Sequence, residues 1–139
     1  MRTAIVTGAA RGLGRAISER LTADGLAVWA VDADAEELAR MAVDVGARSY
    51  PMDVTDEAAV EGLVAALDTC DVLVNNAAIW RFTPLASTPV DEAQRVLSVN
   101  VVAPLLLMQR LLPLLTRSES AAIVNISSIT AKYSPTSAG

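Results

Sequence analysis

The stretch "TAIVTGAARGLG", residues 3–14, decides the fold. Its first part, "TAIVT" (3–7), is rich in apolar and β-branched residues and predicts a short buried strand. Three glycines then open a helical segment, at Gly8, Gly12 and Gly14. Glycines at a strand-to-helix turn let backbone approach a phosphate, and the helix N-terminus supplies N–H donors and positive potential. The pattern predicts a dinucleotide-binding turn; the alternative is a tight turn without a ligand.

The alternation of apolar strand and helix continues along the chain. Further strands are predicted at 26–32, 47–54, 71–77 and 121–127. The third of these is the weakest, because Pro51 cannot donate a backbone hydrogen bond within a sheet. Strands that alternate with helices favour right-handed crossovers and a parallel sheet with helices on both faces. One α/β domain over residues 1–139 follows, with its ligand at the carboxyl ends of the strands.

The helices between these strands have recognisable ends. Gly25 and Gly46 are predicted to end the first two helices. Thr55 is the candidate N-cap of the third, with acidic residues in its first turn. A long helical stretch is predicted over 89–117, as two segments that meet near Asn100.

Composition excludes several classes of function. The net charge is −5 and the basic residues are scattered, which argues against nucleic acid as a partner. The chain has no histidine, so a Ser-His-Asp triad is excluded and a metal site is not expected. The lone Cys70 cannot form an internal disulfide, is expected to be packed in the core, and fits a cytoplasmic protein. Charged residues and prolines interrupt the apolar runs, so no membrane partner is expected.

Acidic residues stand at the ends of the second and third strands. A carboxylate at Asp32 can accept hydrogen bonds from both adenosine ribose hydroxyls and repels a 2′-phosphate, which favours NAD over NADP. Alternatively, Asp32 or Asp34 caps the following helix. Arg11, beside the glycines, could instead meet a 2′-phosphate. Asp53 could reach the adenine amino group, although a capping role is the alternative there as well.

The order of these motifs resembles the short-chain dehydrogenase/reductase family, in the branch with three residues between the first two glycines. The resemblance rests on Thr-Gly-x-x-x-Gly-x-Gly, Asp32, Asp53-Val54, "NNAA" (75–78), "SVNV" (98–101) and "VNISS" (124–128). It implies a Rossmann-like doubly wound parallel sheet with strand order 3-2-1-4-5. The last strands and helices of the family fold would be missing, so residues 1–139 would be an incomplete NAD-binding domain.

The resemblance also implies a set of cofactor contacts. The glycine loop would hold the pyrophosphate through Gly8, Arg11, Gly12, Leu13 and Gly14. Asp32 would bind the ribose, and Asp53 with Val54 the adenine. The "NNAA" stretch would support the sheet and pass under the nicotinamide-side ribose, with Asn76, Ala77 and Ala78 as contacts. Ala78 stands where relatives usually have glycine, so its methyl group demands a small shift of backbone or cofactor.

Two further residues take catalytic roles by resemblance. Ser128 matches the serine that hydrogen-bonds the substrate oxygen, and its neighbour Ser127 is expected to be structural. Asn100 matches the residue that holds a water of a proton relay. Read from the residues alone, Asn100 is a buried amide that satisfies a helix kink.

The acid/base of that family lies in a Tyr-x-x-x-Lys motif, which residues 1–139 do not contain. Tyr133 follows Ser128 too closely and has Ser137, not lysine, four positions later, so we expect it to be a loop residue. The chain alone should therefore be inactive. We expect the N-terminal part of an NAD-dependent oxidoreductase that acts on a small alcohol or ketone and forms a homodimer or homotetramer at full length. The alternative is a non-catalytic nucleotide-binding module.

Overall fold

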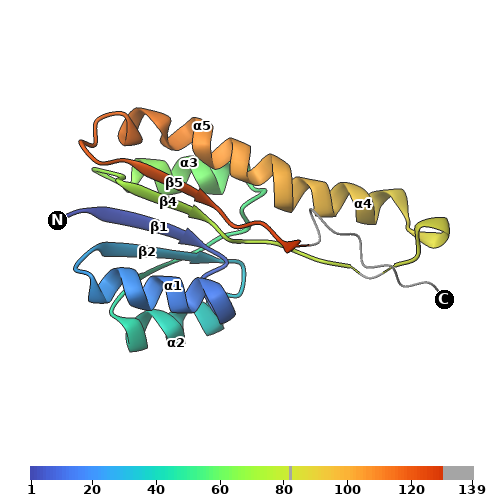
Figure 1. Ribbon diagram of the computed structural model, residues 1–139, viewed down its shortest axis with the longest axis horizontal. Coiled ribbons are helices and arrows are strands. Elements are labelled where there is room, and N and C mark those ends of the chain that lie inside the picture. The colour runs from blue at the N-terminus through green and yellow to red at the C-terminus, as the bar shows by residue number, and fades with distance from the viewer. Residues whose placement is uncertain (82, 130–139) are drawn as a thin grey trace.

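A parallel sheet forms the centre of the computed structural model, which describes residues 1–81 and 83–129 (Figure 1). Within these residues the strand order is β3-β2-β1-β4-β5 and all neighbours pair in parallel. The predicted fold class and strand order are therefore confirmed. The strands are β1 (Thr3–Thr7), β2 (Ala27–Asp32), β3 (Arg48–Pro51), β4 (Val72–Asn75) and β5 (Ala122–Asn125).

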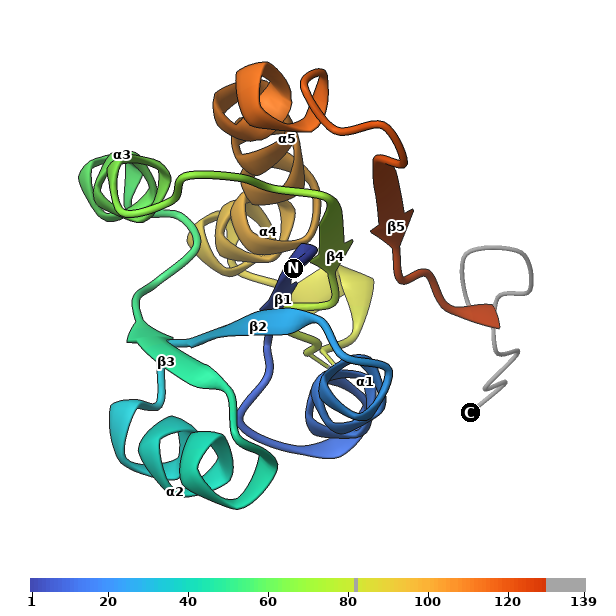
Figure 2. The same cartoon turned by 90° about the vertical axis from the view of Figure 1, so that its left-hand side faces the viewer.

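Helices cover both faces of the sheet (Figure 2). One face carries α1 (Gly12–Ala23) and α2 (Ala35–Val45). The opposite face carries α3 (Glu57–Ala65), α4 (Val90–Leu97) and α5 (Ala103–Leu115). A short 3₁₀ turn, η1 (Leu85–Ser87), precedes α4, and a π turn, η2 (Ser98–Val102), joins α4 to α5.

The helix ends agree with the sequence prediction at the glycines and differ at one cap. Gly25 and Gly46 adopt left-handed φ angles of 85° and 75° directly after α1 and α2. The predicted cap of α3 is wrong: Asp56, not Thr55, accepts hydrogen bonds from the first-turn N–H groups. The Thr55 hydroxyl is instead directed back to the carboxylate of Asp53.

The two outer strands are shorter than predicted. Pro51 is tolerated because it is the last residue of β3, at the edge of the sheet, and the next hydrogen bond comes from Met52 N–H to Asp32. β5 ends at Asn125, level with Asn75, because its neighbour β4 ends there.

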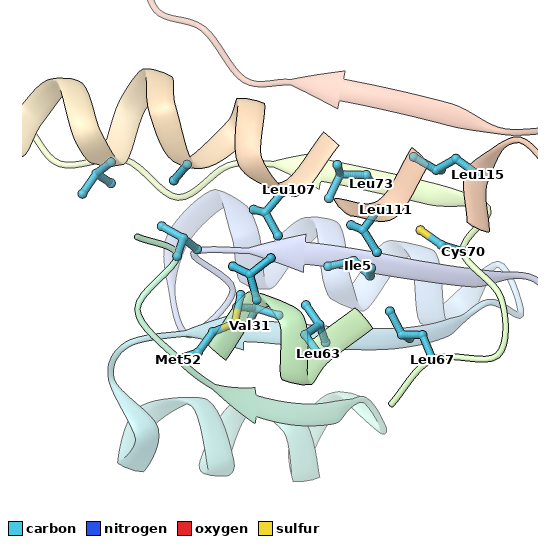
Figure 3. Close-up of a cluster of buried hydrophobic side chains, with 14 residues drawn as sticks. Ile5, Val31, Met52, Leu63, Leu67, Cys70, Leu73, Leu107, Leu111 and Leu115 are labelled. Carbon is cyan, nitrogen blue, oxygen red and sulfur yellow. The ribbon is translucent and has the colours of Figure 1, made fainter. Parts of the chain in front are cut away.

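Two apolar clusters hold the helices on the sheet, because alternate strand residues point to opposite faces. Under α3 and α5, Ile5 and Leu73 pack with side chains of both helices (Figure 3). On the other face, Ala4 and Val6 pack with Leu38 of α2. The sheet is buried from both sides wherever helices cover it.

The helical run from Val90 to Leu115 is long and apolar enough to cross a membrane by length and composition alone. Its second half packs on the sheet, however, through a row of fully or almost fully buried residues one turn apart: Ala103, Leu107, Leu111 and Leu115. The prediction of two helical segments meeting near Asn100 is confirmed by η2. α5 is therefore a core helix of this domain.

Shortening the α5 row should destabilise the domain. Leu111 is fully buried in the cluster of Figure 3, so Leu111→Ala removes packing and leaves a cavity. We expect the free energy of unfolding to fall by about 2–5 kcal/mol in urea titrations. The control Val43→Ala, at an α2 side chain 83% exposed, should change it by less than about 0.5 kcal/mol. Equal effects of the two substitutions would contradict the packing described.

Cys70 should be chemically inert in the folded chain. Burial, reinforced by the negative charge of Asp71, raises the pKa of its thiol to about 12. At pH 8 almost no thiolate is present, and thiolate is the reactive form. Reaction with a disulfide reagent should be far slower under native conditions than in guanidinium chloride. Similar rates in the two conditions would show that the Cys70 environment opens readily.

Candidate functional site

The site begins at the turn between β1 and α1, where glycine is required by close contacts. Gly8 and Gly12 have φ angles of 64° and 56°. A Cβ added at Gly8 would lie 2.8 Å from the Cα of Ala77, and one added at Gly14 would overlap the Gly8 carbonyl oxygen. The start of α1 is therefore pressed onto the end of β1. No side chain fits between them.

A hydrogen-bond network joins this turn to the end of β4. The Thr7 hydroxyl donates to the carbonyl of Val74 (3.3 Å) and accepts from the backbone N–H groups of Asn76 and Ala77, each at 3.0 Å. The Asn76 amide donates in turn to the carbonyls of Thr7 and Gly8, at 2.9 and 3.1 Å. Asn76, predicted as a cofactor contact, thus braces the glycine turn from β4.

The structure assigns the cap of α2 to Asp34, whose carboxylate accepts from Glu37 N–H at 3.1 Å. Asp32, at the end of β2, has a different role. Its two carboxylate oxygens accept from the N–H groups of Ala10 and Asp34, each at 3.0 Å, so Asp32 is fixed beside the glycine turn.

The cations near the glycine turn pair with acids of α2. Arg11 forms an exposed ion pair with Asp34, and Arg15 forms one with Asp44 at 3.1 Å. Leu13 is 56% exposed. Arg11 and Leu13 therefore lie on the outer surface of the turn.

A cavity of about 160 Å³ lies where β1, β2, β3 and β4 end. The predicted residues that line it are Gly8, Asp32, Asp53, Val54, Ala77 and Ala78. Arg11, Gly12, Leu13 and Gly14 do not line it. Parallel strands bring these residues together because their carboxyl ends meet at one edge of the sheet.

Asp53 is held in this cavity by a neighbour that the sequence analysis missed. One Asp53 oxygen accepts from Arg95 of α4 at 2.6 Å, and the other accepts from the Thr55 N–H and hydroxyl at 2.9 and 2.7 Å. Burial raises the Asp53 pKa, but the hydrogen bonds from Thr55 and Arg95 outweigh it, so the pKa lies below its ordinary value. Since 42 residues separate Arg95 from Asp53, no local pattern predicts the pair.

A second cavity, of about 510 Å³, lies beside the first, between β4, β5 and the junction of α4 and α5. Ala77 and Ala78 line both cavities, so the two adjoin along the end of β4. The second is also lined by Asn76, Asn100, Ser127 and Ser128, which brings both predicted catalytic residues to one space. Tyr133 lies outside the described residues.

Asn100 differs from the buried amide predicted from the residues alone, because its side chain is exposed. Its amide pairs with the backbone of Ile79: Oδ1 accepts from the Ile79 N–H and Nδ2 donates to the Ile79 carbonyl, each at 2.9 Å. Where a kink was predicted, the structure has a π turn, in which the Ala103 N–H donates to the Ser98 carbonyl. Asn100 therefore ties the loop after β4 to the long helix.

Asn75 begins the "NNAA" stretch that was predicted to support the sheet, although it was not among the predicted cofactor contacts. Its Nδ2 donates to Oδ1 of Asn125 at 2.8 Å and links the ends of β4 and β5. Asn75 is 5% exposed, and its Oδ1 has no protein partner among the described residues. Asn75 is the last residue of β4, inside the strand predicted over 71–77, so the polar residue in an apolar run was the available signal.

Comparison with known proteins agrees with this geometry. The sequence pattern of the short chain dehydrogenase family matches residues 2–138. Galactitol 2-dehydrogenase of Agrobacterium fabrum is 31% identical over 91% of this chain and 52% of its own length. Crystal structures of NAD+-bound xylitol dehydrogenase and of a metagenomic short-chain oxidoreductase with NADP give TM-scores of 0.90 and 0.87. The xylitol dehydrogenase is 31% identical, and the match covers 96% of this chain and 55% of that one. The metagenomic oxidoreductase is 34% identical, and the match covers 95% of this chain and 64% of that one.

The chain spans about half the length of the curated relatives it matches. Within that half, Gly8 of the glycine turn, the acids at the strand ends and Asn100 at the helix junction line two adjoining cavities. The chain belongs to the short-chain dehydrogenase family.

Proposed function

We propose that residues 1–139 form the NAD-binding part of an oxidoreductase that interconverts a small alcohol and the corresponding ketone. The observation that carries this proposal is the convergence of Gly8, Asp32 and Asp53 on one cavity at the strand ends of a short-chain dehydrogenase domain. Bound nicotinamide would exchange a hydride with the substrate carbon. The residues of this chain hold the dinucleotide and orient the substrate oxygen.

The glycine turn has the features that a pyrophosphate requires. α1 begins at Gly12 with no side-chain cap, whereas Asp34 and Asp56 cap α2 and α3. The first N–H groups of α1 are thus left for an anion, which the helix dipole also favours. Because no side chain fits at Gly8 or Gly14, a pyrophosphate that approaches the turn at these positions would meet backbone alone.

Several contacts support NAD over NADP. Asp32 would accept from the ribose hydroxyls, and its charge would repel a 2′-phosphate. The nearby cations Arg11 and Arg15 already pair with acids of α2 and are drawn away from the cavity. Asp53 and Val54 would meet the adenine, with Asn76, Ala77 and Ala78 under the nicotinamide-side ribose.

Ser128 is proposed to donate a hydrogen bond to the substrate oxygen in the second cavity. The Asn100 amide uses one N–H and one lone pair in its hydrogen bonds to Ile79. Its second N–H and second lone pair are therefore available for a relay water. Relatives named for galactitol, sorbitol and D-threitol support a hydroxylated substrate.

We also propose a cytoplasmic homo-oligomer for the whole protein. The net negative charge and the composition favour a second copy of the chain as the partner, over nucleic acid or a membrane. The long helix exposes apolar side chains that a second copy could cover: Val101, Val102, Leu105 and Leu112.

Residues 1–139 by themselves should bind NAD without turnover. They contain the dinucleotide cavity but no Tyr-x-x-x-Lys, so proton transfer to the substrate oxygen lacks its acid/base. Calorimetric titration of the purified chain should give one NAD site, while NADH with a panel of polyol-derived ketones should show no oxidation above the background rate. Absence of NAD binding by a folded sample would refute the proposal, and ordinary turnover would refute the need for that motif.

Asp32→Ala should relax the preference for NAD over NADP. The substitution removes both the ribose acceptor and the charge that opposes a 2′-phosphate. The dissociation constant for NADP divided by that for NAD should therefore fall by about tenfold or more. The control Glu36→Ala removes an α2 carboxylate that pairs with Arg40 and does not line the cavity, and should leave the ratio unchanged. A ratio unaffected by Asp32→Ala would rule out the ribose assignment.

A further inference from the structure

Arg95 connects α4 to the loop between β3 and α3 across the mouth of the first cavity. Its Nη2 donates to Oδ2 of Asp53 at 2.6 Å, and its Nη1 donates to the Thr55 hydroxyl at 2.9 Å. That hydroxyl donates onward to Oδ1 of Asp53. The three side chains form a closed ring of hydrogen bonds, and Arg95 and Asp53 both line the cavity.

Arg95 is the α4 side chain that bonds to the loop between β3 and α3. The helix has no buried residue of its own, and Glu92 joins it to Thr83 and Arg81 of the preceding loop. Arg95 is half-exposed, so its ion pair with Asp53 contributes little to stability through charge alone. Its main contribution is to fix the positions of its partners. A planar guanidinium can donate to two acceptors at once. Here it fixes the orientation of the Asp53 carboxylate and the position of α4.

The ring also determines which hydrogen-bonding groups face the cavity. One N–H of each outer nitrogen of Arg95 is directed to Asp53 or Thr55. Oδ1 of Asp53 is used twice by Thr55, whereas Oδ2 receives one hydrogen bond and keeps a lone pair. Asp53 therefore offers a hydrogen-bond acceptor to the cavity that it lines.

We infer that Arg95 is a positioning residue that makes this cavity selective for a 6-aminopurine over a 6-oxopurine. This inference rests on the proposed function, in which Asp53 contacts the adenine. An amino group donates to the free lone pair of Asp53, whereas a 6-oxo group would bring its oxygen against the carboxylate. Without Arg95, Thr55 still holds Oδ1 of Asp53, but Oδ2 loses the hydrogen bond that directs it and α4 loses its link to the loop, so the discrimination should weaken.

The test compares the affinities of the chain for NAD and for nicotinamide hypoxanthine dinucleotide, in which the 6-amino group of the purine is replaced by an oxo group and N1 carries a hydrogen. Wild-type chain should prefer NAD, and Arg95→Ala should lower that preference by about fivefold or more, the loss expected when one charge-assisted hydrogen bond is no longer held in place. Arg95→Lys, which can reach only one of the two acceptors, should give an intermediate preference.

Arg110→Ala is the matched control. Arg110 of α5 also pairs with carboxylates of another element, Glu57 and Glu61 of α3, but it does not line the cavity. Its loss should affect stability without changing the preference. A second check uses Asp53→Asn: adding Arg95→Ala to it should change the preference no further, because Arg95 acts through the carboxylate.

The outcomes separate this inference from the proposed function. No binding of either dinucleotide by folded wild-type chain overturns the proposed function and the inference with it. Binding of NAD with a preference that Arg95→Ala leaves unchanged overturns the inference alone, as does equal binding of the two dinucleotides by wild type. If Arg95→Ala does not fold, Arg95→Lys decides: an unchanged preference overturns the inference, and a lowered one supports it.

Discussion

The contact between the beginning of α1 and the end of β1 is the constraint on which the site depends. A side chain at Gly14 would occupy the place of the Gly8 carbonyl, and one at Gly8 would press on Ala77. Helix, strand and the end of β4 therefore converge through backbone alone. This convergence leaves the helix N-terminus facing the strand ends, where an anionic ligand gains most from the aligned peptide dipoles.

Around that contact, the site is assembled by hydrogen bonds between segments far apart in sequence. The Thr7 and Asn76 network joins β1 to β4, Asp32 reaches back to the turn at Ala10, and Asn100 holds the loop at Ile79. Each bond uses a polar group that stands at a strand or helix end. Backbone groups at such ends have no partner within their own element, so side chains from neighbouring elements satisfy them.

The sequence alone was sufficient to predict the elements of the fold and the strand-end residues of the site. Apolar periodicity located the strands, and the topology of a parallel sheet requires their carboxyl ends to meet, which brings Asp32 and Asp53 into one cavity. The partners of those residues were not predictable. The choice of Asp56 over Thr55 as a cap, and the reach of Arg95 to Asp53, depend on distances that periodicity does not encode.

The π turn between α4 and α5 takes up one more residue than an α turn would. An α-helix advances about 100° for each residue, but the wider π turn accommodates the additional residue within itself, so the helix that follows keeps its face. α4 has no buried side chain, whereas α5 directs an unbroken apolar row at the sheet. η2 therefore lets the chain present Asn100 to the loop at Ile79 while α5 keeps its apolar row on the core.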